Sequence, residues 1–228
     1  LCDKDPITAK AVNFEAIKTI LEKRSSSQMV IFPTTNSGYG VGEKGIHCTE
    51  ETPLRPVSLY GQLKVEIEKM ILDSGNSMTF RFATVFGVSP RMRLDLLVND
   101  FTYRAYYDRF IVLFEAHFKR NYLHVRDAAR AFMYGLDNFE NMKGEAYNVG
   151  LSDANISKAE LCKVIKTEIP NFYFSEAEIG EDVDKRDYIV SNEKIKLAGF
   201  KTKHSLTYGI KELIKGFQIV KKSGYGNI

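Results

Sequence analysis

The first 90 residues alternate between helical and strand patterns, and this alternation restricts the chain to a fold built on a parallel sheet. Residues 6–23 repeat apolar side chains about every 3.6 residues, with Pro6 where a first helical turn accepts it. The apolar run 29–32 predicts a strand covered on both faces, 59–73 a second helix, and 79–87 a second buried strand. Helix, strand, helix and strand in this order predict an α/β fold, a doubly wound parallel sheet of Rossmann type.

The second half of the chain is less regular, and we expect it to form a lobe attached to that sheet. The patterns predict helices at 94–106, 125–138, 157–168, 192–198 and 206–219. They also predict strands at 110–114 and 145–149 and short strands near Tyr173 and Tyr188. Such a lobe is the usual place for substrate recognition in this class of fold.

Composition excludes several classes of partner. The net charge of +3 comes from 32 basic and 29 acidic residues spread along the 228-residue chain, so neither a nucleic-acid groove nor an anionic membrane is indicated. No apolar run approaches the roughly 18 residues of a membrane span. The start lacks the layout of a secretory signal, and we expect a cytoplasmic protein. Cys2, Cys48 and Cys162 form no disulfide or metal-binding pattern, so we expect no metal.

Tyr60 and Lys64 lie one helical turn apart and therefore on the same face of the second helix. A nearby ammonium group stabilises a phenolate, so this pairing predicts a tyrosine of lowered pKa that exchanges a proton with a substrate hydroxyl. Because the chain contains 12 tyrosines and many lysines, the same spacing also arises by chance. The motif therefore needs a second feature beside it.

That second feature is the polar loop 34–40, which follows the first predicted strand. Open α/β sheets bind ligands beyond the carboxyl ends of their strands, so a hydroxyl in this loop is placed to bind the oxygen that Tyr60 titrates. The alternative is an ordinary turn rich in threonine, asparagine and glycine.

A strand that ends in a Ser/Thr-rich loop with Tyr-Gly, followed by Tyr60-x-x-x-Lys64 on a helix, resembles the extended short-chain dehydrogenase/reductases. Their best-known members are the UDP-glucose 4-epimerase-like enzymes and the nucleotide-sugar 4,6-dehydratases. Further agreement extends over most of the chain, at residues 51–56, 81–87, 120–127, 147–150, 194–200 and 206–213.

The resemblance implies a role for each matching residue. The catalytic set would be Thr35, Tyr60 and Lys64, with Lys64 also holding the nicotinamide ribose. The residues that bind the cofactor, NAD or NADP, would be Tyr60, Lys64, Phe82, Thr84 and Val85. The nucleotide-sugar substrate would contact Thr35, Asn36, Ser37, Arg91, Arg120 and Arg186, with the arginines binding its diphosphate.

The implied activity is nucleotide-sugar epimerisation, by reversible NAD(P)-dependent oxidation at a sugar carbon, with C4 favoured, through a keto intermediate. The runner-up is a nucleotide-4-keto-sugar reductase, because the same residues serve a single reduction. Dehydration is disfavoured, since Asn36 and Ser37 replace the Asp-Glu pair that the dehydratases use as acid and base.

A second departure from the family is the absence of the GxxGxxG turn that binds the dinucleotide pyrophosphate. The chain begins at Leu1 without a methionine, so we expect about 70 to 90 further residues upstream, which would include the position that selects NAD or NADP. A truncated, non-catalytic nucleotide-binding member of the fold is the other possibility.

The family pattern also divides the chain. Residues 1–88 would form the C-terminal part of the dinucleotide-binding domain, and 89–228 mainly a smaller α+β substrate lobe, with 120–150 returning to the first domain. Members of the family commonly pair through the helices that correspond to 6–23 and 58–73. The resemblance therefore implies a homodimer.

Overall fold

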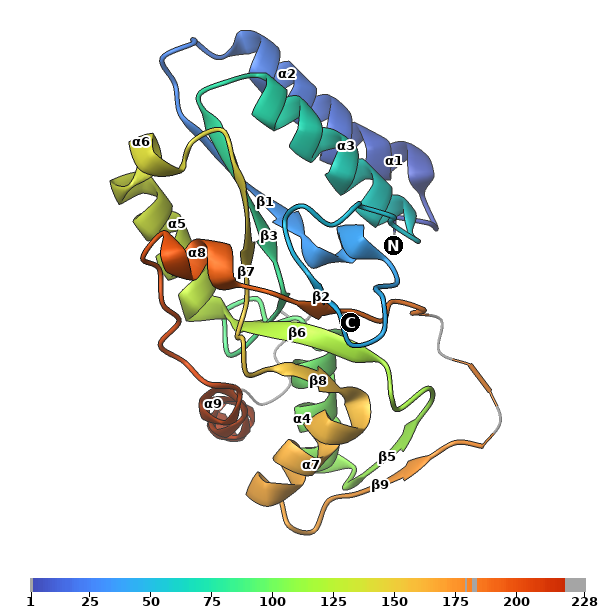
Figure 1. Cartoon of the computed structure of the whole chain (residues 1–228). Coiled ribbons are helices and arrows are strands. Elements are labelled where there is room, and N and C mark those ends of the chain that lie inside the picture. The colour runs from blue at the N-terminus through green and yellow to red at the C-terminus, as the bar shows by residue number, and fades with distance from the viewer. Residues whose placement is uncertain (1, 179, 182–183, 220–228) are drawn as a thin grey trace.

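A parallel three-stranded sheet combines two strands from the first half of the chain with one from the second half (Figure 1). The computed structural model describes residues 2–178, 180–181 and 184–219. β1 (Val30–Thr35) pairs in parallel with β3 (Ser77–Phe82), which pairs in parallel with β7 (Ala146–Val149). The carboxyl ends of all three strands therefore meet at one edge, where this class of fold binds ligands. The predicted α/β fold with a parallel sheet is confirmed.

Helices cover both faces of this sheet. α3 (Leu59–Asp73) links β1 to β3, packs against them, and has the bounds that the sequence predicts. Its start is fixed by the Ser58 hydroxyl, which accepts a hydrogen bond from the Gly61 amide at 3.2 Å. On the other face, α5 (Val125–Asp137) packs Phe132 against Phe80 with ring centroids 5.6 Å apart.

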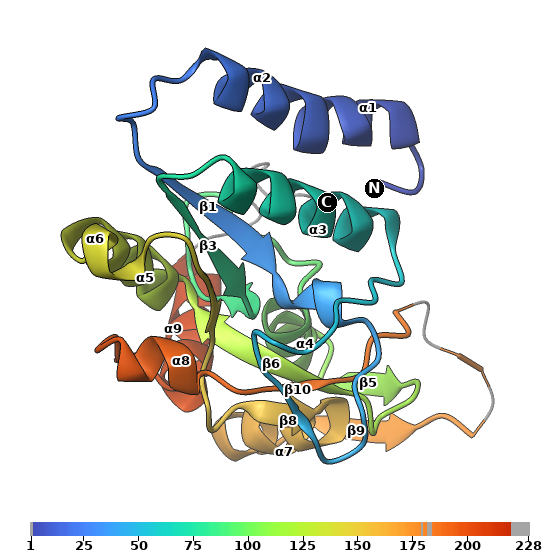
Figure 2. The same ribbon diagram turned by 45° about the horizontal axis from the view of Figure 1, so that its top comes forward.

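The predicted helix 6–23 is continuous, but its pitch changes in the middle. It consists of α1 (Pro6–Lys10), a π-helical turn η1 (Ala11–Glu15) and α2 (Ala16–Lys23). Asp5 caps its first turn by accepting a hydrogen bond from the Thr8 amide at 3.1 Å. Figure 2 shows this helix lying alongside α3.

β1 is less buried than the sequence predicts. β3 is buried along its whole length, whereas most of β1 is half-buried and Pro33 is exposed. β1 stands at one end of the described sheet, where a strand is less covered and a proline, which has no N–H, is tolerated. The prediction of a strand covered on both faces is therefore correct for β3 and wrong for β1.

The predicted strand 79–87 is two strands, because the chain leaves the first sheet at Ala83. β4 (Thr84–Phe86) pairs in parallel with β6 (Lys119–His124), which pairs antiparallel with β8 (Asn155–Ser157). The junction between the two sheets therefore lies directly after the carboxyl end of β3.

The remaining elements surround these two sheets. In chain order they are η2 (Asn36–Tyr39), β2 (His47–Cys48), α4 (Leu97–Tyr107), β5 (Phe110–Leu113), α6 (Phe139–Met142), α7 (Lys158–Glu168), β9 (Tyr173–Glu176), β10 (Ile189–Val190), α8 (Glu193–Leu197) and α9 (Leu206–Ile219). α4, α7 and α9 enclose an apolar core of their own, to which β4 contributes the buried Phe86. Among the described residues, no helix is long and apolar enough to cross a membrane.

Gly150 follows β7 at a position without room for a side chain. A Cβ there would lie 1.7 Å from Asn121 Oδ1 and 3.0 Å from Ala83 Cβ. Asn121 is buried, and its amide nitrogen donates to the Leu151 carbonyl at 2.6 Å, so it has little freedom to move. We expect Gly150→Ala to lower the free energy of unfolding by about 1–3 kcal/mol, measured by urea denaturation. A loss below about 0.5 kcal/mol, typical of surface substitutions, would contradict this.

Candidate active site

A cleft of about 970 Å³ opens at the carboxyl edge of the central sheet and continues along β4 and β6. Most of the residues that the sequence singles out meet in its wall, although they come from distant parts of the chain. These are Thr35, Ser37, Tyr60, Lys64, Phe82, Thr84, Val85, Arg120 and Arg186.

Two predicted substrate residues are not in that wall. Asn36 is buried at 1% exposure, and neither end of its side-chain amide has a hydrogen-bond partner among the described residues. Arg91 is also absent from the lining, whereas Arg93, two residues further on, is present. The family resemblance points to both arginines as weaker candidates for the diphosphate, and only Arg93 lines the cleft.

Tyr60 and Lys64 line the same cleft, as their one-turn spacing on α3 predicts. The Lys64 ammonium lies 6.0 Å from the centroid of the Tyr60 ring and 4.6 Å from that of Phe32. It also donates a hydrogen bond to the Pro33 carbonyl at 3.3 Å. The lysine is thus held between its own helix and β1, rather than against the phenolic oxygen.

The acidity of Tyr60 differs from the prediction. Burial raises the pKa of Tyr60 above its ordinary value, and this exceeds the lowering by a hydrogen bond with Thr35 and by the charges of Arg186 and Arg93. Burial likewise lowers the pKa of Lys64. The pKa of Tyr60 is thus raised rather than lowered in this structure, in which the Lys64 ammonium group faces Phe32 and the Pro33 carbonyl.

A chain of hydrogen bonds runs from the loop after β1 to the arginines. The Thr35 hydroxyl accepts from the Ser37 amide at 3.1 Å and donates to the Ser37 hydroxyl at 3.0 Å. The Ser37 hydroxyl also accepts from Nη1 of Arg186. Tyr60 is thereby connected, through Thr35 and Ser37, to the positive charge of Arg186.

Arg186 and Arg120 share one carboxylate. Arg186 binds Asp184 in a bidentate manner, and Nη2 of the fully buried Arg120 lies 3.1 Å from Asp184 Oδ1. The Arg120 guanidinium also lies 5.5 Å from the Tyr188 ring centroid. Although burial alone would raise the pKa of Asp184, the hydrogen bonds of Arg186 and the charge of Arg120 hold it at about 2. Two cations and one anion leave this end of the cleft positively charged.

The low pKa of Asp184 makes a stability contribution that depends on pH. A carboxyl group whose pKa is lower in the folded than in the unfolded protein stabilises the fold when ionised. Its contribution is fully present above the ordinary value of 3.8 and is lost as the pH falls through about 2. We expect the wild type to be more stable than Asp184→Asn at about pH 6 and the two to converge near pH 2. Urea unfolding across this range checks the expectation, and a difference independent of pH would refute it.

The sequence interpretation assigned no role to several polar residues of the cleft wall. Among these are Asp95, Asp184 and Tyr188. Nε of Arg93 donates to Asp95 Oδ1 at 3.0 Å, so this pair occupies the cleft wall near Tyr60. A usable signal for Asp184 was its place beside Arg186 in the charged run 181–187, since alternating charges two residues apart often pair.

One part of the cleft wall suits the nicotinamide end of a dinucleotide. It is formed by Phe82, Thr84 and Val85, together with Lys64. Apolar side chains can pack on a flat ring, and an ammonium group has three donors for ribose hydroxyls. Among the described residues, Lys64 uses one of those donors, toward Pro33. The described residues contain no group of three or more His, Cys, Asp or Glu side chains that could hold a metal ion.

Known structures share this fold. UDP-glucose 4-epimerase of Thermus thermophilus, in complex with NAD, is 20% identical with a TM-score of 0.79, over 95% of this chain and 73% of that one. dTDP-glucose 4,6-dehydratase of Bacillus anthracis str. Ames, in complex with NAD, is 23% identical with a TM-score of 0.78, over 91% of this chain and 68% of that one. At these identities the likeness establishes the fold alone.

Sequence comparison identifies the family. The uncharacterized UDP-glucose epimerase YtcB of Bacillus subtilis (strain 168) is 28% identical over 181 residues, which is 75% of this chain. The chain spans 56% of the length of that relative. Residues 2–150 match the sequence model of the NAD-dependent epimerase/dehydratase family. This match agrees with the family resemblance that the Tyr60 and Lys64 motif indicated. The chain therefore belongs to the NAD-dependent epimerase/dehydratase family.

Proposed function

We propose that this chain carries the catalytic residues of a nucleotide-sugar epimerase that oxidises and re-reduces one sugar carbon, C4, with NAD or NADP. The main support is that a single cleft joins a hydrogen-bonded Tyr60 and Thr35 to a positively charged end containing Arg120 and Arg186. A nucleotide-sugar has the matching layout, with a neutral sugar joined to a diphosphate. Planar guanidinium groups are suited to phosphate oxygens.

In the proposed reaction, Tyr60 as phenolate removes the proton of the C4 hydroxyl, and Thr35 holds that oxygen by a hydrogen bond. A bound nicotinamide would supply the acceptor for the hydride of the C4–H bond. Lys64 would hold its ribose, and Phe82, Thr84 and Val85 would line its ring. The oxidation leaves a ketone and a protonated Tyr60. Rotation of the ketone and reversal of the same steps on its other face give the epimer.

Two alternatives use the same cleft differently. A 4-keto-sugar reductase would perform the second half of the reaction once, with Tyr60 donating its proton. A non-catalytic member of the fold would bind the nucleotide without turnover. Dehydration is not supported, because Asn36 lies outside the cleft wall and the Ser37 hydroxyl is bonded to Thr35 and Arg186.

The test is a panel of nucleotide-sugars incubated with the intact protein and NAD or NADP, followed by NMR of the sugar ring. Epimerisation predicts a C4 epimer that forms without net consumption of cofactor. A reductase would instead consume reduced cofactor in proportion to a supplied keto-sugar. Binding with no product in either assay would favour the non-catalytic alternative and refute the proposal.

We further infer that the protein forms a homodimer through its first helix and α3. The support is that Ile7, Val12 and Ile20 on the first helix are 85%, 61% and 57% exposed. Apolar side chains so exposed on one helix are common at protein interfaces. Light scattering coupled to size exclusion should give twice the mass of one intact chain, and a monomer at micromolar concentration would contradict the inference.

A further inference from the structure

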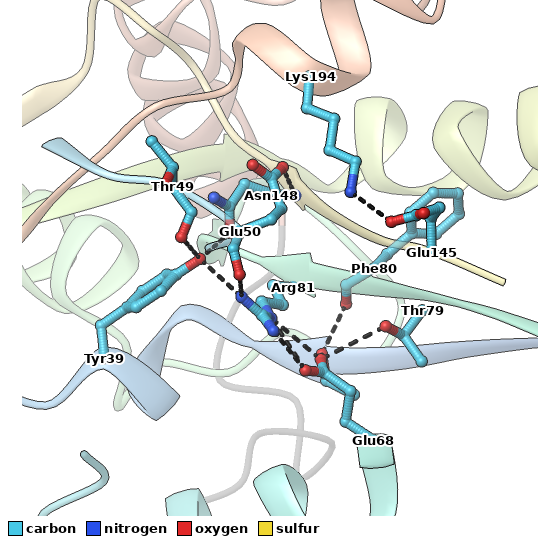
Figure 3. A network of polar contacts seen from close by, with 11 residues as sticks. Tyr39, Thr49, Glu50, Glu68, Thr79, Phe80, Arg81, Glu145, Asn148 and Lys194 are labelled. Atoms are coloured by element: carbon cyan, nitrogen blue, oxygen red, sulfur yellow. Dashed lines mark hydrogen bonds and ion pairs between the residues drawn. The ribbon is translucent and has the colours of Figure 1, made fainter. Parts of the chain in front are cut away.

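A buried carboxylate joins the catalytic helix to two strands of the central sheet (Figure 3). Glu68 lies on α3 and is 4% exposed. Its Oε1 accepts hydrogen bonds from Nη2 and Nε of Arg81 on β3, at 2.7 and 3.0 Å. Its Oε2 accepts from the Thr34 hydroxyl on β1, at 2.6 Å. One side chain therefore ties the helix to both strands that end at the cleft.

The arginine of this pair is itself held from the opposite side. Nη1 of Arg81 donates to the Tyr39 hydroxyl at 3.1 Å and to the Glu50 carbonyl at 3.0 Å. The Tyr39 hydroxyl donates to Asn148 Oδ1 at 2.7 Å. Burial raises the pKa of Tyr39 to about 12, so its proton is retained for that bond at neutral pH. The position of Arg81 is thus set by groups on three further segments, which leaves Glu68 little freedom.

An ion pair is not required for stability at such a position. Removing two charges from water costs about as much as their attraction returns, and well-packed apolar residues of similar size are often as stable or more so. Unlike apolar packing, the ion pair supplies hydrogen bonds of defined direction. Its hydrogen bonds fix both the rotation and the axial position of α3 against the sheet.

Glu68 lies on the same helix, and toward the same side of it, as both members of the proposed catalytic pair. It follows Lys64 by four residues and Tyr60 by eight, so all three lie toward one side of α3. Its other partner, Thr34, directly precedes Thr35. A shift of the carboxylate would therefore move the Tyr60 phenol relative to the Thr35 hydroxyl.

We propose that Glu68 is a positioning residue, which through Arg81 and Thr34 sets how closely Tyr60 and Lys64 approach Thr35 and the reacting sugar carbon. The proposal rests on the function proposed above. Misplacement of reacting groups by about 1 Å can cost roughly 100-fold in rate. Loss of the Glu68–Arg81 ion pair should therefore affect turnover far more than binding.

Three variants separate positioning from stability. Glu68→Gln removes the negative charge and leaves Arg81 without its carboxylate partner. The double variant Glu68→Met with Arg81→Met replaces the pair by apolar side chains. Glu66→Gln makes the same charge change at a less buried position of the same helix and serves as the control.

In the intact protein we expect Glu68→Gln to lower kcat about 100-fold, with little change in the KM for the nucleotide-sugar, since the phosphate-binding arginines lie on other elements. The double variant should recover the unfolding midpoint but keep the low kcat, while Glu66→Gln resembles the wild type. If kcat recovers together with stability in the double variant, the pair is only structural and the proposal is overturned.

A second readout needs neither substrate nor turnover. With tyrosine labelled at Cζ with carbon-13, the Tyr60 signal is assigned by its loss in Tyr60→Phe. We expect that signal to shift in the double variant and to stay unchanged in Glu66→Gln, because the hydrogen bond with Thr35 is altered in the first case alone. An unmoved Tyr60 signal refutes the positioning role even if the protein turns over nucleotide-sugars. Absence of turnover in the wild type refutes the proposed function and leaves this readout decisive.

Discussion

Replacing Tyr60 by phenylalanine is expected to lower kcat about 1000-fold while leaving the affinity for the nucleotide-sugar nearly unchanged. Proton transfer by a positioned side chain contributes about 10² to 10⁴ in rate, and phenylalanine removes the oxygen while keeping the ring. The arginines that would bind the diphosphate lie on other elements, on β6 and in the segment before β10. The measurements are steady-state kinetics and isothermal titration calorimetry with the intact protein.

The matched control is Tyr173→Phe, which removes the same hydroxyl from a tyrosine that is 62% exposed on β9. That variant should retain wild-type kinetics. If Tyr60→Phe keeps kcat within a few-fold of the wild type, another group is the base, and the assignment of Tyr60 is wrong. If both kcat and binding are lost, the change has disturbed the cleft, and the thermal unfolding midpoint should fall as well.

The pH dependence of kcat gives independent information on the same group. In this structure burial holds the pKa of Tyr60 above its ordinary value, with Arg186 and Arg93 acting in the opposite direction. A base of raised pKa is mostly protonated at neutral pH, so kcat for oxidation should rise with pH on the alkaline side of neutrality. The rise should be absent from the residual activity of Tyr60→Phe.

Local periodicity was sufficient to predict the elements that carry Tyr60, Lys64 and the loop with Thr35. The apolar stripe of 59–73 and the glycine that follows it define α3. The apolar run 29–32, which overlaps the start of β1, is bounded by serines and a polar loop. These signals are short-range, because a helix or strand reveals its buried face within one or two turns. For the same reason the spacing of Tyr60 and Lys64 was enough to place them on one face of the helix.

What could not be predicted depends on contacts between distant segments. Nothing in the run around Arg81 indicates that its charge is buried, since the partner Glu68 lies 13 residues away on another element. The break at Ala83 was hidden because no glycine, proline or other turn residue separates the two flanking strands. The direction of the Lys64 ammonium depends on Phe32 and Pro33, which no spacing rule connects to it. These are the places where tertiary packing overrides local pattern.

Prediction from local sequence is limited in the same way for the part of the cleft wall that comes from residues after position 170. The sequence identified Arg186, but not the carboxylate of Asp184 that binds it and Arg120 together. An ion pair between β6 and a loop more than 60 residues later is a property of the fold. The resemblance to a family pointed to the arginines through local motifs, whereas Asp184, which pairs with both, belongs to none of those motifs.

Replacing Arg120 by methionine is expected to weaken binding of a nucleotide diphosphate about 100-fold, which corresponds to about 3 kcal/mol. Arg120 is 1% exposed, and its Nε has no hydrogen-bond partner among the described residues. A bound phosphate would supply an acceptor for a buried charged donor, and hydrogen bonds to charged groups contribute about 1.5–3 kcal/mol each. Methionine retains the apolar stem beside Tyr188, so the fold should be preserved.

The control for Arg120→Met is Arg126→Met, which removes an arginine whose side chain is 54% exposed and pairs with Glu212 outside the cleft. Calorimetric titration with uridine diphosphate should show weaker binding for Arg120→Met alone, and kcat at saturating nucleotide-sugar should change little, because uniform binding affects KM. Equal affinities for both variants would contradict the diphosphate assignment. Since Asp184 keeps its bidentate bond to Arg186, a loss of affinity without a loss of stability would show that Arg120 acts on the ligand rather than on the fold.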